Sequence, residues 1–361
     1  MLHTGLREAR INAVRVTPTV PSLPTISYRA LRLLGRDLRA FLTNYPLWSA
    51  YPKADVYHVT SQPLAALLVL RRPKGKVVVT VHDIFPYMLR NDPQLRSSYY
   101  IDPFYVRVAM AGLKRADHLI AISEYTKQCV VEHLGIAPEK ISVIYHGIDH
   151  QHFRPLPVPT GIRESYGLPE GRRYLIYVGR EDPRKNLVTL VRALAQLRRD
   201  LPDVELIKVG RSHSDIERRR LVELATQLGI RTAIHFLEDV PEDDLPPLYN
   251  LADLCVMPSP YEGFGFPALE AMACGTPIVC ANVGSLHELV GNAGVQVYPH
   301  DIDILAGNLL ALLNSTDKQL MLRRTGQDRA ANFTWTATIL NTTGVYERLI
   351  HADSDGGANR L

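Results

Sequence analysis

The feature that most constrains the fold is an alternation of short β-branched runs with helical patterns along the second half of the chain. The runs are RYLIYVG, VELIKVG, AIHFL, DLCVMPS and TPIVCA, and helical segments such as residues 186–201 and 214–228 separate them. Strands that alternate with helices in this way form a parallel sheet with helices on both faces. The sequence therefore predicts an α/β, doubly wound, Rossmann-like domain here.

The first half shows the same alternation less regularly. Its expected strands are INAVRVT, DVYHVT, KVVVTVHD, DHLIAIS and ISVIYHG, and its expected helices lie near residues 28–43, 103–115 and 124–134. With 361 residues, of which 46% are hydrophobic, the chain is long enough for two cores rather than one. We therefore expect two doubly wound domains.

Three prolines indicate the border between these domains. Pro155, Pro157 and Pro159 lack the backbone donors that the interior of a strand or helix needs. The expected domains are residues 1–155 and 156–333, followed by a purely helical end at 334–351. Residues 352–361 offer little apolar surface to bury, so we expect a flexible tail there.

The start of the chain departs from a complete doubly wound domain. Such a domain opens with a buried strand and a tight glycine-rich turn, whereas residues 1–10 resemble the end of a helix that leads into INAVRVT. We therefore expect the first βα unit of the N-terminal domain to be missing.

Cysteine usage and hydropathy indicate in which cellular compartment the protein is expected. The four cysteines lie in apolar surroundings without close pairs, which is typical of buried thiols in a reducing compartment. No apolar run is long enough to span a bilayer, and the first ten residues lack the apolar core of a secretion signal. The sequence predicts a cytoplasmic protein.

Charge is distributed unevenly along the chain. Residues 1–155 carry 20 Lys and Arg against 11 Asp and Glu, whereas the remainder carries 21 against 26. A basic first half suggests an anionic partner, although a solvated basic face gives the same count. In YRALRLLGRDLRAFL, arginines recur at helical spacing opposite leucines. This segment could make a peripheral contact with the inner face of the membrane, or it could be an ordinary surface helix that packs on the core.

The most informative stretch is SPYEGFGFPALEAMACGTPIV, residues 259–279. Pro267 fits the first turn of a helix, and Gly275 followed by Pro277 fits its end. The preceding glycines, Gly263 and Gly265, allow backbone amides to approach a ligand closely. Because a helix N-terminus presents unsatisfied N–H groups, the sequence predicts a site for an anion such as a diphosphate.

Two carboxylates bracket this predicted anion site. Glu262 precedes the loop, and Glu270 is expected inside the first helical turn. A carboxylate can accept from two neighbouring hydroxyls, so one could hold a ribose diol and the other a transferred sugar. The alternative is a surface loop in which Glu270 only favours the helix N-terminus.

Two further polar segments follow expected strands. In YVGREDPRKN, Arg180 and Lys185 stand beyond the carboxyl end of a strand, where parallel sheets bind ligands, and could neutralise a leaving diphosphate. In TVHDIFP, His82 could hydrogen-bond a donor sugar and Asp83 could orient an acceptor hydroxyl. A solvated basic loop and a histidine that caps the next turn are the respective alternatives.

Capping explains three other polar residues. Ser123 fits the N-cap of a helix that begins at residue 124. Asp301 and Asp303 spell Asp-x-Asp, but they stand at the head of an expected helix and are interpreted as caps rather than metal ligands.

With these residues in hand, the chain resembles glycosyltransferase family 4 from about residue 54 to 351. The family's Glu-x7-Glu motif matches Glu262 and Glu270, with support from YVGREDPRKN, IYHGID and HD. The resemblance implies a GT-B fold, in which two Rossmann-like domains face a central cleft and the last helix crosses back to the N-terminal domain. It also implies hexose transfer with retention, without a metal, from GDP-mannose, UDP-glucose or a similar donor.

The resemblance also implies roles for individual residues. Arg180 and Lys185 would bind the diphosphate, Glu270 the ribose, and Glu262 and His82 the sugar. The nucleobase would lie against residues 237–240. The donor-binding set is Gly179, Arg180, Lys185, Glu238, Val240, Gly263, Phe264, Gly265, Phe266 and Glu270, and the catalytic set is Glu262, His82 and Asp83. The expected partners are a nucleotide sugar and a glycan, lipid-linked or small-molecule acceptor, with no nucleic acid and no tightly bound cofactor.

Two other functions use a similar architecture. A nucleotide-sugar 2-epimerase would isomerise the donor without forming a glycoside, although the spacing of the two glutamates speaks against it. A non-catalytic glycosyltransferase-like subunit would bind nucleotide sugar without turnover, and the degraded glycine loop is compatible with that role.

Overall fold

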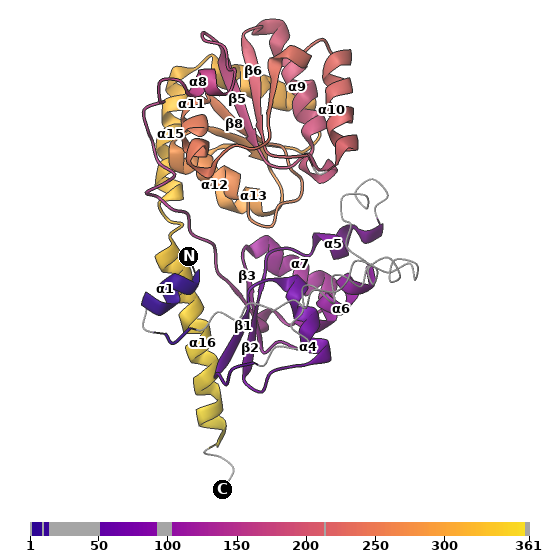
Figure 1. Ribbon diagram of the computed structural model, residues 1–361, viewed down its shortest axis with the longest axis vertical. Helices are drawn as coiled ribbons and strands as arrows, with labels where there is room; N and C mark the ends of the chain where they lie inside the picture. Colours follow the sequence, from indigo (N-terminus) through magenta and orange to yellow (C-terminus); the bar gives the residue numbers. More distant parts are fainter. Residues whose placement is uncertain (1, 9–10, 14–50, 92–102, 213, 358–361) are drawn as a thin grey trace. The chain divides into compact units, whose positions relative to one another are not determined.

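The computed structural model describes residues 2–8, 11–13, 51–91, 103–212 and 214–357 (Figure 1). Contacts divide the chain into two compact units. Unit 1 comprises Met1–Gly147 together with Trp335–Leu361, and unit 2 comprises Ile148–Thr334.

Unit 1 is built on a four-stranded parallel sheet in the order β1-β2-β3-β4. Its strands are β1 (Val56–Val59), β2 (Lys76–Val81), β3 (His118–Ala121) and β4 (Ile141–Val143). Its helices are α1 (Leu2–Glu8), α4 (Leu67–Leu70), α5 (Phe85–Met88), α6 (Pro103–Leu113), α7 (Glu124–Leu134) and α16 (Trp335–Gly357).

Strand β2 shows how the sheet of unit 1 is buried on both faces. Val77 and Val79 join the core formed with α4, α6 and α7, whereas Val78 joins the core beneath α1 and α16. Successive side chains of a strand point to opposite faces, so this nearly unbroken apolar run serves two cores. Helices α1 and α16 approach closely, because a Cβ at Gly5 would lie 2.0 Å from Cδ1 of Ile339.

Unit 2 contains a six-stranded parallel sheet in the order β10-β9-β8-β5-β6-β7. Its strands are β5 (Arg173–Val178), β6 (Val204–Val209), β7 (Ile234–Leu237), β8 (Leu254–Met257), β9 (Ile278–Ala281) and β10 (Val295–Val297). Its helices are α8 (Ile162–Ser165), α9 (Leu187–Asp200), α10 (Asp215–Gln227), α11 (Leu245–Leu251), α12 (Phe266–Cys274), α13 (Gly284–Val290), α14 (Ile302–Leu313) and α15 (Thr316–Ala330).

This strand order has a functional consequence. Strand β5, the first of unit 2, pairs with β6 on one side and with the later strand β8 on the other. The chain therefore winds outward from β5 in both directions, which is the Rossmann order with its topological switch point between β5 and β8. The predicted parallel α/β architecture is confirmed.

The expected elements agree closely with the structure where the chain is described. Helix α7 begins and ends as expected, with the Ser123 hydroxyl accepting from the Thr126 amide at 3.0 Å and Gly135 (φ 63°) ending it. The caps at Gly275 of α12 and Asp301 of α14 are confirmed as well, since Gly275 adopts a left-handed conformation and Asp301 accepts from the Ile304 amide. Asp303 lies in the first turn of α14 and is not its cap.

Some expectations differ from the structure or lie outside it. Residues 11–13 of INAVRVT form no strand, and residues 14–17 and the helix expected at 28–43 lie outside the described residues. Strand β10 was not predicted. The end of the chain was expected to be a loose tail from residue 352, but α16 continues through Gly357.

The division between the units falls before the proline segment rather than within it. Ile148 forms an isolated parallel bridge with Thr334, and its amide donates to the Phe333 carbonyl at 3.1 Å. The Leu156 amide donates to Asn250 Oδ1 at 3.0 Å. These contacts attach the segment that contains Pro155 to unit 2, which local proline signals alone do not reveal.

The predicted buried state of the thiols is confirmed. Cys129, Cys255, Cys274 and Cys280 are all free and buried. Burial raises the pKa of each thiol, for Cys129 to about 11 and for Cys274 and Cys280 to about 12. These side chains are therefore protonated and inert at neutral pH.

Candidate active site

The candidate site is formed by two loops at the switch point of unit 2. The loop after β5 contains Gly179 and the 3-10 turn η5 (Pro183–Lys185), and the loop after β8 leads to α12. The Asn186 side chain joins them, because its amide nitrogen donates to the Pro258 carbonyl at 3.1 Å. Asn186 adopts φ 58°, a left-handed conformation that asparagine tolerates better than most residues.

An ion pair connects the same two loops at the level of their charged side chains. Lys185 Nζ lies 2.5 Å from Glu262 Oε1 and 2.6 Å from its Oε2. Both side chains are largely buried, with 15% of Lys185 and 8% of Glu262 exposed. Ser285 Oγ donates to the Glu262 carbonyl at 2.8 Å, and Arg184 Nη1 donates to the Tyr261 carbonyl at 3.0 Å.

The sequence did not predict that Lys185 and Glu262 form an ion pair. The family resemblance assigns the two residues to separate parts of a ligand, Lys185 to the diphosphate and Glu262 to the sugar. Arg184 Nη1 also lies 4.0 Å from Glu262 Oε2. A largely buried ion pair adds little to folding stability, because both ions lose hydration. Polar atoms of a ligand could supply the remaining hydrogen bonds, so the pair is chemically suited to hold a phosphate on its ammonium and hydroxyls on its carboxylate.

Helix α12 begins directly at the second loop. Its N-cap is Gly265 with φ 105°, and Pro267 stands in the first turn. A Cβ at Gly265 would lie 2.7 Å from Leu286 Cδ2, so both the conformation and the packing require glycine. Phe264 is buried, whereas Phe266 is exposed and Gly263 partly so. The first residue of the helix, Phe266, is thus exposed and lies four positions after Glu262.

Glu270 occupies a different position from the one expected. It is the fifth residue of α12 and not in its first turn, which contains no acidic residue, so that expectation is wrong. The reason is that Phe266, rather than Pro267, opens the helix. Glu270 Oε2 accepts from the hydroxyl of the buried Tyr249 at 2.8 Å. Burial raises the pKa of Glu270 to about 7.

The remaining donor-site candidates of unit 2 lie at neighbouring strand ends. Gly179 follows β5, and its amide donates to the Val209 carbonyl at 2.9 Å. The Arg180 side chain is exposed. Glu238 and Val240 follow β7, where Glu238 pairs with Arg218 at 2.9 Å. The carboxyl ends of β5, β7 and β8 thus carry these candidates along the edge where Rossmann sheets bind ligands.

His82 and Asp83 belong to unit 1, where they follow β2. His82 Nε2 lies 2.9 Å from the Thr60 carbonyl oxygen. A carbonyl only accepts, so Nε2 carries the proton and, in a neutral ring, Nδ1 is the acceptor. Asp83 Oδ1 accepts from the amide of Phe85, the first residue of α5, at 3.3 Å. The N-cap of this helix is Ile84, without a side-chain cap hydrogen bond, so His82 does not cap the turn.

The His82 ring is held by aromatic neighbours within unit 1. It stacks on His146, with the ring centroids 5.4 Å apart, and His146 in turn lies 5.6 Å from Trp335 at the start of α16. Burial and the neighbouring His82 lower the pKa of His146 to about 4, so it is neutral at physiological pH. The sequence motif IYHGID supports the family resemblance but does not by itself predict this role for His146.

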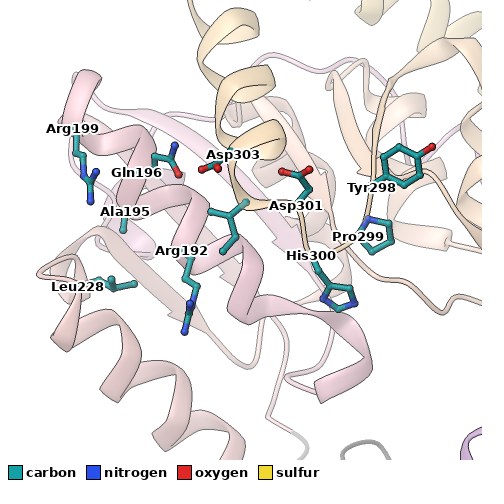
Figure 2. A pocket seen from close by; sticks show the side chains of 11 residues that line it. Arg192, Ala195, Gln196, Arg199, Leu228, Tyr298, Pro299, His300, Asp301 and Asp303 are labelled. Atoms are coloured by element: carbon teal, nitrogen blue, oxygen red, sulfur yellow. The ribbon is translucent and has the colours of Figure 1, made fainter.

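A hollow of about 720 Å³ lies elsewhere in unit 2 (Figure 2). Figure 2 shows that α9 and the segment leading into α14 line it, with Arg192, Arg199, Tyr298, His300, Asp301 and Asp303 among the residues. None of the candidate donor-site residues lines this hollow, and most of its charged side chains are solvated. It is therefore not the site indicated by the motifs.

The described residues lack a membrane-spanning helix and a metal-binding cluster. Within these ranges, no helix is long and apolar enough to cross a membrane. The same residues contain no group of three or more His, Cys, Asp or Glu side chains placed to hold a metal ion.

Comparison with known proteins gives two family matches. Residues 160–329 match the model described as "Glycosyl transferases group 1", and residues 3–152 match "Glycosyltransferase Family 4". Both matches agree with the family that the glutamate motif indicated, although the N-terminal match begins at residue 3 rather than near residue 54.

Curated relatives show the same family. A D-inositol 3-phosphate glycosyltransferase of Salinispora arenicola is 36% identical over 66% of this chain and 56% of its own length. The O-antigen chain mannosyltransferase B of Escherichia coli is 39% identical over 76% of this chain and 71% of its own. The chain thus spans little more than half the length of the inositol-phosphate enzymes that it matches.

Solved structures share the fold. Sucrose-phosphate synthase from Thermosynechococcus elongatus is 25% identical with a TM-score of 0.72, covering 93% of this chain and 83% of that protein. Anabaena HepE in complex with UDP-glucose is 25% identical with a TM-score of 0.69, covering 81% and 79%. These matches confirm the expected GT-B fold class, and the chain belongs to the group 1 glycosyltransferases of family 4.

Proposed function

We propose that this chain is a retaining glycosyltransferase that moves a hexose from a nucleotide diphosphate sugar to an acceptor. The observation that carries the proposal is the meeting of Lys185 and Glu262 at the switch point of unit 2, beside the start of α12. Cationic and amide donors suit a diphosphate, and carboxylates suit the hydroxyls of a sugar.

In this proposal, unit 2 binds the donor. Arg180 and Lys185 would neutralise the diphosphate together with amides of residues 263–266, and Glu270 would accept from the ribose diol. Glu262 would accept from the sugar. The Lys185–Glu262 pair then has a mechanistic use, because phosphate can take over the ammonium while sugar hydroxyls take over the carboxylate.

The chemistry that we propose needs no protein nucleophile. The acceptor hydroxyl attacks the anomeric carbon as the bond to the diphosphate breaks, and the leaving phosphate takes the hydroxyl proton. Preorganised positive groups around the departing phosphate would supply most of the rate acceleration. His82 would contact the donor sugar and Asp83 the acceptor, and both assignments rest on the sequence pattern. The transfer is proposed to be metal-independent.

For substrates, we propose GDP-mannose or UDP-glucose as donor and a glycan, lipid-linked or small-molecule hydroxyl as acceptor. Two relatives are named for transfer to D-inositol 3-phosphate and for mannosyl transfer to the O-antigen chain, and HepE was solved with UDP-glucose. We also propose that the protein is cytoplasmic and contacts the membrane peripherally through its basic N-terminal half.

A panel of UDP- and GDP-linked sugars tests the proposal in two steps. A true donor raises the melting temperature, because a ligand that binds only the folded state stabilises it. Mass spectrometry should then detect free nucleotide and a glycoside when inositol phosphate or saccharide acceptors are added. Isomerised donor without glycoside would indicate an epimerase, and binding without any turnover would indicate a non-catalytic subunit.

A further inference from the structure

A second group of charged side chains lies in the interior of unit 2, at the carboxyl ends of β5, β6 and β7. Glu181 and Lys208 form its centre, with Lys208 Nζ 2.7 Å from Glu181 Oε1 and side-chain exposures of 0% and 1%. Arg218 of α10 reaches the same carboxylate, because its Nε lies 2.8 Å from both Glu181 oxygens. Lys208 also donates to the Gly210 carbonyl at 2.5 Å.

Arg218 extends this group toward the surface. Its Nη1 lies 2.9 Å from Glu238 Oε1, and its guanidinium lies 4.3 Å from the ring centroid of Phe236. Arg218 is 22% exposed and Glu238 48% exposed. The two basic and two acidic residues form a chain of alternating charge, Lys208–Glu181–Arg218–Glu238, that runs from the core to the β7 loop.

Such a buried group is not explained by stability alone. Withdrawing two charges from water is unfavourable, and apolar residues of similar volume often stabilise a core equally well. Burial opposes ionisation of Glu181, but hydrogen bonds from Arg218 and Lys208 outweigh it and lower the pKa of that carboxyl. Glu181 is therefore held as a carboxylate, and hydrogen bonds from Arg218 and Lys208 fix its position.

The position of the group points to the loops of the candidate site. Glu181 directly follows Arg180 in the loop after β5 and forms an isolated parallel bridge with Ser212 after β6. Glu238 opens the loop after β7. Arg218 uses separate edges of its guanidinium for these two carboxylates, which a lysine ammonium cannot reproduce.

We propose that Arg218 is a positioning residue that fixes the loop after β5 relative to the loop after β7, and so sets the affinity and base preference for the donor nucleotide. This inference rests on the proposed function of unit 2. It assigns no contact between Arg218 and substrate. Its effect reaches the donor through the backbone that carries Arg180 and through Glu238.

The test compares Arg218→Lys, Glu238→Gln and the double variant, with Arg220→Lys as matched control. Arg220 lies on the same helix, is 65% exposed and pairs with Glu217 one turn away. Calorimetry would measure the Kd of UDP and of GDP, and turnover assays would separate KM from kcat. We expect Arg218→Lys to raise the Kd and KM of the preferred nucleotide at least about fivefold and to narrow the UDP-to-GDP preference, with kcat nearly unchanged. The control should match the wild type.

The double variant decides whether the two residues act together. If Arg218 works through Glu238, the effects of the two single changes on Kd should be non-additive. A lower melting temperature with unchanged Kd, KM and base preference would overturn the inference and leave a purely structural group. A wild-type protein that binds neither UDP nor GDP would instead overturn the proposed function itself, so the two failures are distinguishable.

Discussion

Replacing Glu270 with glutamine should remove part of the pH dependence of folding stability. The pKa of Glu270 is raised by burial from 4.5 to about 7, so the folded protein holds this proton more tightly than the unfolded chain does. The stabilising contribution is therefore complete below about pH 4.5 and is lost as pH rises through 7. Glutamine never ionises and keeps an oxygen that can accept from Tyr249.

The size of the effect follows from the two pKa values. Each pKa unit corresponds to about 1.4 kcal/mol, so the gap between 4.5 and about 7 amounts to about 3 kcal/mol. For a domain of this size, about 1 kcal/mol shifts the melting temperature by about 2–4 °C. The melting temperature of Glu270→Gln minus that of the wild type should therefore increase by several degrees as pH rises from 5 to 8.

Differential scanning calorimetry from pH 5 to pH 8.5 measures this difference directly. Other titrating groups are common to both proteins and cancel in the comparison. Glu223→Gln serves as the control, because Glu223 is exposed on α10 and its loss should leave the pH profile unchanged. A melting-temperature difference between wild type and Glu270→Gln that does not vary with pH would refute the reasoning.

The same carboxyl gives nucleotide binding its own pH dependence. If ribose hydroxyls donate to ionised Glu270, bound nucleotide lowers the pKa of Glu270. The nucleotide then binds more tightly as pH rises from 6 to 8. The terminal phosphate of UDP or GDP also ionises near pH 6, but this contribution is present in both proteins. Glu270→Gln should therefore bind nucleotide more weakly and with a shallower pH dependence than the wild type.

Three further outcomes are expected. Glu262→Gln should lower kcat about tenfold or more while changing nucleotide Kd less, as rapid-quench and calorimetric measurements would show, and equal losses in both would contradict its assignment to the sugar. His82→Ala should lower turnover and leave UDP and GDP affinity unchanged, because His82 belongs to unit 1; weakened nucleotide binding would argue against this. Gly265→Ala should destabilise the fold by about 1–3 kcal/mol in denaturant unfolding, since φ 105° and the 2.7 Å approach to Leu286 exclude a Cβ, and an unchanged midpoint would oppose that account.

Local chemistry made most of the fold predictable from the sequence. Helix α7 follows from a serine cap at its start and a glycine at its end, and β2 from an apolar run that must be buried on both faces. Strand β10 was not predicted because it has only three residues with a glutamine at the centre. Such a pattern is too short to distinguish from a loop.

Contacts between distant residues were not predictable in the same way. Lys185 and Glu262 are 77 positions apart, and Tyr249 and Glu270 are 21 apart. The first pair meets because β5 and β8 are neighbours in the sheet, a relation that only the strand order supplies. Lys208 is a charged residue within the apolar run of β6, and the structure buries it against Glu181, which also accepts from Arg218 of α10. Motif spacing therefore indicated the kind of site, whereas tertiary packing decides which charges are paired.

Hydrogen–deuterium exchange of the backbone amides, with and without UDP or GDP, tests the central claim most directly. The account predicts that nucleotide protects residues 179–186 and 262–270, at the switch point between β5 and β8. Protection should be absent from residues 192–199 and 298–303 around the hollow in Figure 2. Protection around that hollow instead, or none at the two loops under saturating nucleotide, would contradict the assignment of the donor site.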